Sequence, residues 1–269
     1  MEQINKNGIE LLQFSSFPSE NICHFSTTIH GGISKDAYST LNLSLYSGDN
    51  CEDVYENRGR LAKVLNVLPE NVFIPYQTHG DKILDINQSF LDLSDEEKQQ
   101  KLNGVDAIIT NKKHIGIGIT TADCVPLLIF DPDKEILATI HAGWKGTVAR
   151  IAAKTGEKMI ADYGCSPCEL LVGIAPSISP DCFEVGDEVG EAFILGGFNL
   201  STISYRNAET NKLHINLWEA NKIQLLEIGI LSQNIEVAEL CTLSNPNMFF
   251  SARRQTINSG RMLTGGVIK

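Results

Sequence analysis

The stretch TADCVPLLIFDPDKEILATIHAGWKGT, residues 121–147, contains two short apolar runs beside two reactive side chains. The runs VPLLIF (125–130) and EILATIH (135–141) are separated by a polar break, which is typical of strands. Cys124 lies just before the first run and His141 ends the second. Side chains at strand ends can converge at one edge of a sheet. The stretch therefore predicts either an open metal site or a cysteine nucleophile with a histidine base.

Short apolar runs and amphipathic helices continue along the rest of the chain. Apolar stripes predict helices over residues 52–66, 147–162 and 217–229. A capping box at Ser94 and Glu97 predicts a further helix whose charged face is exposed to solvent. The other runs that we expect to be strands are 72–77, 82–87, 105–110, 115–120, 170–175 and 237–240, the first two forming a hairpin around the turn THGD. The mixture of strands and helices predicts a single α+β or α/β domain over residues 1–269.

Composition narrows the class of protein. The chain has 269 residues, 42% of them hydrophobic, which is enough for a sizeable core. Its net charge of −11 argues against a general nucleic-acid or membrane-surface binder, although one basic pocket for a small anion is compatible with it. We find no signal peptide and no apolar run approaching the roughly 20 residues that span a bilayer, so we expect a cytoplasmic protein. Seven cysteines at irregular spacing fit free thiols, metal ligands or a nucleophile better than disulfides.

His79, in the sequence QTHGD, adds a third candidate to Cys124 and His141. The separations of 45 and 17 residues do not match the short pairs of structural zinc sites. Three ligands from distant segments, with a fourth position for water or substrate, are the catalytic pattern. Two alternatives remain open on spacing alone. Each residue could be a separate packing or turn residue, or Cys124 and His141 could form a nucleophile–base pair oriented by Asp106 or Asp123, which leaves His79 without a role.

Two cations are candidates for binding an anion. Arg58 falls on the same helical stripe as Val54 and Leu61, so its guanidinium faces inward and needs a partner. That partner is either an internal carboxylate or a substrate anion such as phosphate. Lys145 lies in HAGWKGT, where helix N-terminal amides and the ammonium group could hold an anion, although the order of a P-loop is absent.

A cluster of arginines near the C-terminus stands out in an acidic protein. It either closes a pocket over an anion or forms a solvated edge. Its members are Arg253, Arg254 and Arg261.

Several of these motifs together resemble one known family. In chain order they are NR (57–58), QTHG, VDAIIT, TADCVPLLIFD, HAGWKGT, GIAPSISPDCFEVG and FFSARR…SGR. In this set the chain is similar to the laccase-domain family, whose members are regarded as purine nucleoside phosphorylases with adenosine deaminase activity. The resemblance implies a single-domain four-layer α/β/β/α sandwich with mixed sheets. It also implies that His79, Cys124 and His141 bind one zinc ion.

The resemblance further implies what the site acts on. The expected substrates are phosphate and purine nucleosides such as adenosine, inosine and methylthioadenosine. Our candidates for binding the phosphate are Arg58 first and Lys145 second, on their charge and placement in the sequence alone. We expect a monomer that binds neither nucleic acid nor membranes. A copper-dependent polyphenol oxidase, the family's older description, and a metal-free Cys–His hydrolase are the alternatives. Six histidines without an H-x-H pair argue against a four-copper laccase.

Overall fold

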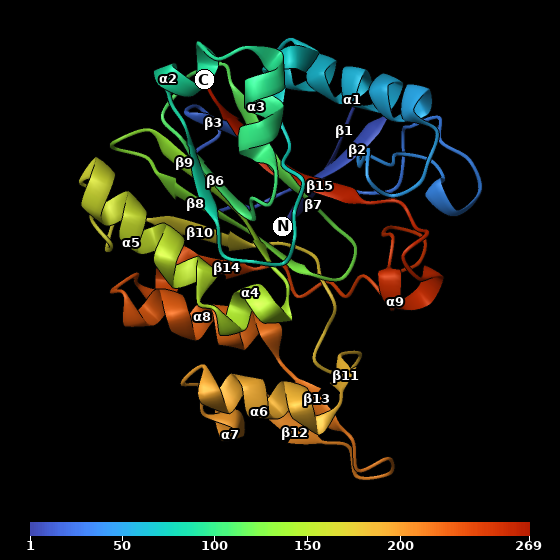
Figure 1. Ribbon diagram of the computed structural model, residues 1–269, viewed down its shortest axis with the longest axis vertical. Coiled ribbons are helices and arrows are strands. Elements are labelled where there is room, and N and C mark those ends of the chain that lie inside the picture. Colours follow the sequence, from blue (N-terminus) through green and yellow to red (C-terminus); the bar gives the residue numbers. More distant parts are fainter.

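The two apolar runs of residues 121–147 form neighbouring antiparallel strands, β8 (Val125–Asp131) and β9 (Ile136–Ala142). They lie at the centre of a six-stranded sheet in the order β14-β10-β8-β9-β6-β5. The computed structural model describes residues 1–269 (Figure 1). The remaining strands of this sheet are β5 (Ile83–Ile86), β6 (Ala107–Thr110), β10 (Leu171–Ile174) and β14 (Ile235–Val237).

A second six-stranded sheet has the order β1-β2-β3-β15-β7-β4. Its strand β15 comes last in the chain but lies inside the sheet, antiparallel to both β3 and β7. The strands are β1 (Glu2–Lys6), β2 (Ile9–Gln13), β3 (Ile22–Thr27), β4 (Val72–Phe73), β7 (Gly116–Thr121) and β15 (Met262–Ile268).

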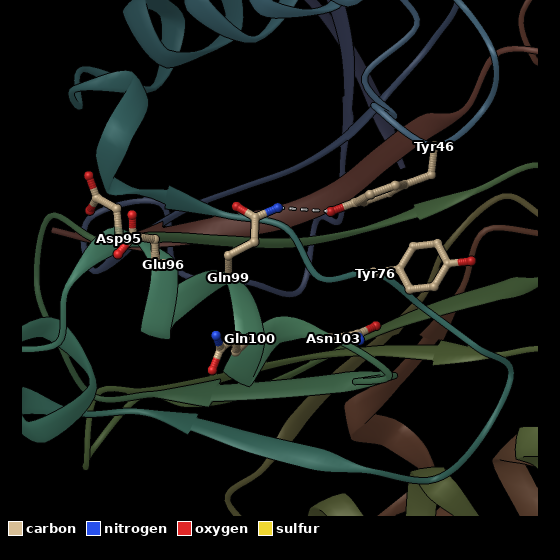
Figure 2. Close-up of a pocket in the computed structure, with 7 residues that line it drawn as sticks. All are labelled: Tyr46, Tyr76, Asp95, Glu96, Gln99, Gln100 and Asn103. Atoms are coloured by element: carbon tan, nitrogen blue, oxygen red, sulfur yellow. Dashed lines mark hydrogen bonds between the residues drawn. The ribbon is translucent and has the colours of Figure 1, made fainter.

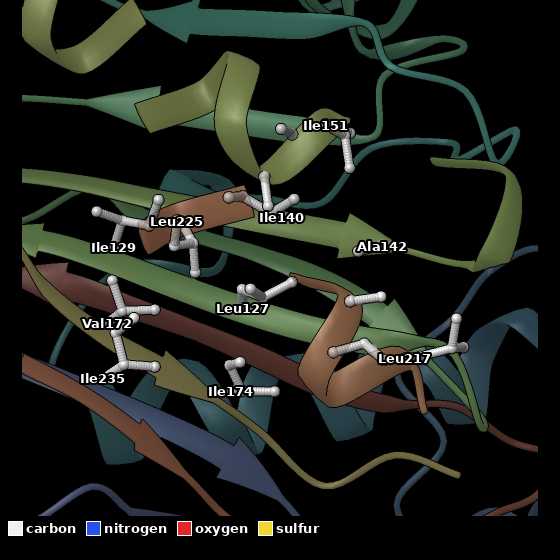
Figure 3. Close-up of a cluster of buried hydrophobic side chains, with 14 of the residues drawn as sticks. Leu127, Ile129, Ile140, Ala142, Ile151, Val172, Ile174, Leu217, Leu225 and Ile235 are labelled. Carbon is white, nitrogen blue, oxygen red and sulfur yellow. The ribbon is translucent and has the colours of Figure 1, made fainter. Parts of the chain in front are cut away.

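Strand β8 shows how the sheets are layered, because its side chains alternate between two apolar faces. Leu127 and Ile129 belong to the largest buried cluster, which the β8 sheet shares with the helices on its outer face (Figure 3). Leu128 and Phe130 belong to a different cluster, shared with Ile117 of β7 and other residues of the second sheet. The two sheets therefore pack face to face through one side of β8.

Helices cover both outer faces. Leu61 and Leu65 of α1 (Cys51–Leu65) pack on the second sheet with Leu11. On the β8 sheet lie α5 (Ile151–Tyr163) and α8 (Leu217–Glu227), which contribute Ile151 and Leu225 to the largest cluster (Figure 3). The expected four-layer α/β/β/α arrangement with mixed sheets is thus confirmed. The shorter helices are α2 (Gln88–Leu91), α3 (Asp95–Leu102), α4 (Trp144–Val148), α6 (Asp187–Leu195), α7 (Leu200–Ile203) and α9 (Ala252–Gln255).

Beside this sandwich lies a small three-stranded sheet with α6 and α7, seen at the lower end of Figure 1. Its order is β11-β13-β12, from strands β11 (Glu184–Val185), β12 (Ser204–Arg206) and β13 (Leu213–Ile215). None of the helices is both long enough and apolar enough to cross a membrane.

Three local expectations were wrong. Residues 72–77 and 82–87 do not form a hairpin, because β4 pairs with β7 in one sheet and β5 pairs with β6 in the other. The helix expected over 147–162 is broken into α4 and α5 at Arg150, which has a left-handed φ of 63°. The strand expected over 237–240 is β14, which ends at Val237.

Candidate metal centre

Three connections between strands bring together the three candidate ligands. His79 lies where the chain crosses from β4 in one sheet to β5 in the other, Cys124 lies between β7 and β8, and His141 lies near the end of β9. One ligand atom from each residue lies within 4.8 Å of the other two. The imidazole rings of His79 and His141 are 4.8 Å apart between centroids and inclined by 72°. The structure thus brings the three residues into one cluster, as the sequence predicts.

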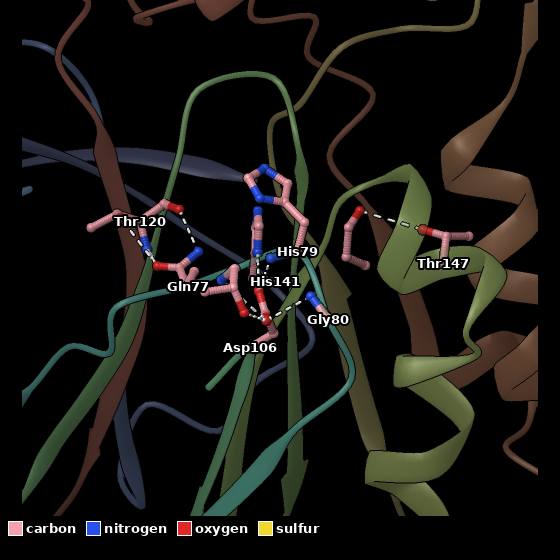
Figure 4. A network of polar contacts seen from close by, with 9 residues as sticks. Gln77, His79, Gly80, Asp106, Thr120, His141 and Thr147 are labelled. Carbon is pink, nitrogen blue, oxygen red and sulfur yellow. Dashed lines mark hydrogen bonds and ion pairs between the residues drawn. The ribbon is translucent and has the colours of Figure 1, made fainter. Parts of the chain in front are cut away.

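Asp106, just before β6, orients this cluster (Figure 4). Its Oδ1 atom lies 2.7 Å from Nδ1 of the buried His141, so a neutral His141 donates from Nδ1 and presents Nε2 to the cluster. The same carboxylate accepts the backbone N–H of His79 at 3.0 Å and that of Gly80 at 2.8 Å. One buried aspartate therefore fixes both the ring of His141 and the backbone of His79.

The backbone around the cluster permits close approach of the donors. A Cβ atom added at Gly143 would lie 3.1 Å from Sγ of Cys124 and 3.1 Å from Cδ2 of His79, so a larger residue would crowd both. His79 has a φ of 62° and Asp123, next to Cys124, has a φ of 89°. Left-handed backbone at non-glycine residues is uncommon and is concentrated at functional sites.

Asp123 holds a different part of the structure. Its carboxylate accepts hydrogen bonds from Oγ1 of Thr242 at 2.6 Å, Oγ of Ser251 at 2.9 Å and the backbone N–H of Arg253 at 2.7 Å. It therefore anchors the C-terminal segment beside Cys124. Of the two aspartates considered from the sequence as orienting groups, only Asp106 contacts a cluster side chain.

The protonation of the cluster follows from its mutual contacts. Burial opposes ionisation of the Cys124 thiol, but the neighbouring His141 and His79 outweigh it and lower the pKa of Cys124 to about 6. Burial likewise opposes protonation of His141, but Cys124 and Asp106 raise the pKa of His141 to about 9. Burial also disfavours the Asp106 carboxylate, yet contacts with His141 and Gly80 lower its pKa. The cluster therefore favours a thiolate.

This donor set fits a metal ion. A thiolate and two imidazole nitrogens are the ligands that zinc and copper prefer. The Asp106–His141 contact has the form of the outer carboxylate that fixes a metal-ligating histidine. His79 is exposed while His141 is buried, so one side of the cluster faces solvent. Three protein ligands with an open side match a catalytic rather than a structural site.

The open side faces a cavity of about 460 Å³. Thr120 and Gln77 in its wall bond to each other, since Oε1 of Gln77 accepts the backbone N–H of Thr120 at 2.8 Å (Figure 4). The other lining residues are Ser44, Tyr46, Pro75, Tyr76, His79, Thr121, Ala122, Cys124, His141, Ala252, Ile257 and Arg261. The volume falls within the range of small-molecule sites.

Arg261 brings a cation into this cavity. Burial lowers its pKa, opposed by the negative charges of Cys124 and Asp123. Its Nη1 atom donates to carbonyl and hydroxyl oxygens of Ser259, at 2.5 and 2.7 Å. The other two arginines of its sequence cluster, Arg253 and Arg254, donate to backbone carbonyls instead and do not line the cavity. The sequence indicated the three arginines but not which of them faces the candidate metal centre.

Arg58 lies in the wall of a neighbouring cavity of about 360 Å³ that shares Tyr46 with the first. Its Nε atom donates to the carbonyl oxygen of Leu43 at 2.9 Å, and its buried Nη2 atom has no partner. Burial lowers the pKa of Arg58 to about 10. The internal salt bridge considered from the sequence is absent, because no carboxylate lies within 4.0 Å of the guanidinium.

Lys145 is exposed on α4 and does not line the cluster's cavity. Its Nζ atom lies 5.6 Å from the centre of the Trp144 ring, which is a cation–π contact. The structure therefore does not bring Lys145 to the cluster as it brings Arg261.

The chain is similar to known proteins over almost its whole length. A family model described as multi-copper polyphenol oxidoreductase laccase matches residues 23–269. The chain is 44% identical over 259 residues to a purine nucleoside phosphorylase of Bacteroides thetaiotaomicron, covering 96% of each. It is 42% identical to "adenosine deaminase RL5" from an unknown prokaryotic organism, over 96% of this chain and 97% of that one.

Solved structures show the same fold. The crystal structure of YlmD from Geobacillus stearothermophilus aligns with a TM-score of 0.90 at 30% identity, over 99% of this chain and 98% of that one. The Bacillus licheniformis hypothetical protein YfiH aligns with a TM-score of 0.88 at 27% identity, over 98% of each chain.

Proposed function

The chain belongs to the family described as multi-copper polyphenol oxidoreductase laccase, and from this premise we propose that it is a zinc-dependent purine nucleoside phosphorylase that also deaminates adenosine. The observation that carries the proposal is the cluster of His79, Cys124 and His141, with ligand atoms within 4.8 Å of one another. The printed names of the two relatives, a purine nucleoside phosphorylase and an adenosine deaminase, support the same substrate class.

Zinc is favoured over copper by the surroundings of the cluster. A blue-copper site combines two histidines and a cysteine with a weak axial ligand, usually a methionine. No methionine lines the cavity, and Oε1 of Gln77, which could otherwise serve, already accepts two hydrogen bonds from Thr120. Zinc needs no such ligand, and when bound it supplies Lewis-acid activation of water or substrate at neutral pH. His79, Cys124 and His141 would hold the ion, and Asp106 would keep the proton of the neutral His141 ring on Nδ1, so that Nε2 is the ligand atom.

The phosphorolytic reaction requires the protein to bind a nucleoside and phosphate together. A phosphate oxygen bonds to C1′ of the ribose as the bond from C1′ to the purine breaks, and the purine leaves with a proton. The phosphate charge needs a cation. Arg58 is our choice, because its buried Nη2 lacks a partner; Lys145, the second candidate from the sequence, does not line the cluster's cavity. Deamination instead adds water at C6 and releases ammonia. We propose that residues 1–269 do this as one domain, in a cytoplasmic monomer.

The test follows products of zinc-loaded protein incubated with adenosine or inosine, with and without phosphate. We expect free base and ribose 1-phosphate only when phosphate is present, and inosine from adenosine in both conditions. His141→Ala should abolish both reactions, since it removes a ligand. Activity retained in His141→Ala would identify a contaminating enzyme, and absence of every product with the wild type would refute the proposal.

A cysteine hydrolase is the second candidate, because Cys124, His141 and Asp106 also stand in the order nucleophile, base and orienting acid. Elemental analysis of protein purified without added metal separates the two functions. We expect about one zinc per chain in the wild type and a sharp fall in Cys124→Ser. Protein without metal that is alkylated at Cys124 and loses a hydrolytic activity would favour the hydrolase.

A further inference from the structure

A cavity of about 780 Å³ (Figure 2) shares two wall residues with the cavity that the candidate metal centre faces. Tyr46 and Tyr76 line both this cavity and that of the cluster, and Tyr46 also lines the cavity of Arg58. The five other residues of its wall are Asp95, Glu96, Gln99, Gln100 and Asn103, from α3 and the residue after it. We call Tyr46 and Tyr76 the tyrosine pair.

The tyrosine pair exposes two aromatic rings where three cavities meet. The rings are 4.6 Å apart between centroids and inclined by 66°, and the residues are 48% and 42% exposed. Large rings are normally turned into a core, since burying one contributes about 1.5–3 kcal/mol. Here two neighbouring rings leave apolar surface uncovered beside a reactive cluster, which is the property of a ligand-binding surface.

Local hydrogen bonds hold the pair in place. The backbone N–H of Tyr76 donates to the carbonyl of Leu102 at 3.1 Å, and its carbonyl accepts from Gly104 at 2.8 Å. The hydroxyl of Tyr46 accepts from Nε2 of Gln99 at 3.3 Å, drawn as the dashed line in Figure 2. The backbone that carries Tyr76 and the ring of Tyr46 are thus positioned in advance, which reduces the conformational entropy lost when a flat ligand stacks on the pair.

The rest of the wall selects the kind of ligand. It contains two carboxylates, Asp95 and Glu96, and no cation, which disfavours phosphate. The amide side chains of Gln100 and Asn103 make no hydrogen bond within the protein, so each can donate or accept. An amide can pair with a 6-amino group or with a 6-oxo group, so the wall can accommodate either type of purine edge.

We propose that the tyrosine pair is the stacking surface for the purine base of the substrate, a placement that rests on the proposed nucleoside function. Every base has a π face, so an aromatic platform binds bases with little preference among them. For phosphorolysis this placement leaves the cluster's cavity and the Arg58 cavity, both of which Tyr46 borders, for the ribose and the phosphate. Deamination would require C6 of the base at the cluster instead.

The test is the binding of free adenine to the zinc-loaded full chain, measured by isothermal titration calorimetry. Loss of one base–aromatic stack is worth about 1–3 kcal/mol, so Tyr76→Ala and Tyr46→Ala should each raise the Kd for adenine about tenfold. Tyr76→Leu, which keeps apolar bulk without a π face, should also weaken binding. Tyr76→Phe should leave it unchanged, because the Tyr76 hydroxyl makes no hydrogen bond.

The matched control is Tyr205→Ala, on the three-stranded sheet, because Tyr205 is also 42% exposed. It should change neither the Kd for adenine nor the KM for nucleoside. In steady-state assays Tyr76→Ala should raise the KM for nucleoside and leave that for phosphate unchanged, because Tyr76 does not line the Arg58 cavity.

An unchanged adenine Kd in Tyr76→Ala, an equal loss in Tyr205→Ala, or no adenine binding by the wild type would overturn the inference. Tyrosine-dependent adenine binding by a protein that turns over no nucleoside would instead uphold the stacking surface and refute the proposed function.

Discussion

At the scale of single residues, Asp106 connects the candidate metal centre to the rest of the fold. It is fully buried and bonds to His141 of β9 and to the backbone of His79, which lies in the connection from β4 to β5. The sequence identified Asp106 as a candidate orienting group but could not distinguish it from Asp123. The distinction depends on which strands become neighbours, and β6 lies beside β9 only in the folded sheet.

Asp106→Asn should weaken zinc binding by about 10- to 100-fold, because it removes the charge that fixes the tautomer of His141. The measurement is a competition titration with a chromophoric chelator, and Asp92→Asn, on an exposed residue, is the control. The far-ultraviolet circular dichroism spectrum should remain that of the wild type. Unchanged zinc affinity would show that the Asp106 contact is only structural.

Arg58 is the residue whose surroundings most directly call for an anion. Arg58→Ala should raise the KM for phosphate about tenfold or more, the effect of losing a charge-assisted hydrogen bond, and change the KM for nucleoside much less. Arg60→Ala is the matched control, since Arg60 lies on the same helix and pairs with Glu56. Equal rises in both KM values, or lost stability without a kinetic effect, would contradict the phosphate role.

At the scale of elements, α1 and the loop before it are joined by the fully buried Asn57. Its Oδ1 accepts from Ile33, and its Nδ2 donates to Ser34 and to the carbonyls of Thr40 and Asn42. These side-chain hydrogen bonds hold the loop in place of the backbone hydrogen bonds that a strand would make. They also fix the rotation of α1, and thereby the placement of the next residue, Arg58.

Asn57→Ala should lower the free energy of unfolding by about 2–4 kcal/mol, because buried backbone groups lose their partners. Urea denaturation measures the change, and Lys63→Ala, on an exposed position of the same helix, should stay within about 0.5 kcal/mol of the wild type. A loss as small as that of the control would mean that water replaces the amide.

Periodicity predicted the central elements well and the connections poorly. Strands β8 and β9 and helix α1 follow from apolar runs and a stripe, because burial dictates both. Helix α8 lies where it was expected, but its buried face also contains Asn221 and Gln224, which the apolar pattern did not indicate. The hairpin around THGD was wrong because local turn residues do not reveal that Asp106 takes up the N–H groups of His79 and Gly80. The crossing between sheets that results is what brings His79 to Cys124.

At the scale of the whole molecule, stability depends on the cluster buried between the two sheets. Phe130 of β8 is fully buried in this layer, beside Phe17 at 6.3 Å between ring centroids. The resemblance of the sequence to a known family implied two sheets in contact, and the alternation along β8 explains the contact physically. The amino-acid composition alone predicted only that the protein has a sizeable core, not that two sheets pack against each other.

Phe130→Ala should reduce the free energy of unfolding by about 3–5 kcal/mol, since a cavity would open between layers that cannot collapse onto it. Thermal and urea denaturation measure this loss, with Leu195→Ala as control because Leu195 is 89% exposed. A loss below about 1 kcal/mol would show that the sheets repack around the gap.

The place of β15 inside its sheet affects how the protein is made in the cell. β15 is synthesised long after β3 and β7, the strands that it joins. Until it emerges from the ribosome, the nascent chain exposes two unpaired strand edges that would otherwise be internal. Open edges of this kind invite pairing with other chains, so molecular chaperones have a defined target on the incomplete polypeptide. A chain stalled shortly before residue 262 should therefore aggregate far more readily than the complete protein.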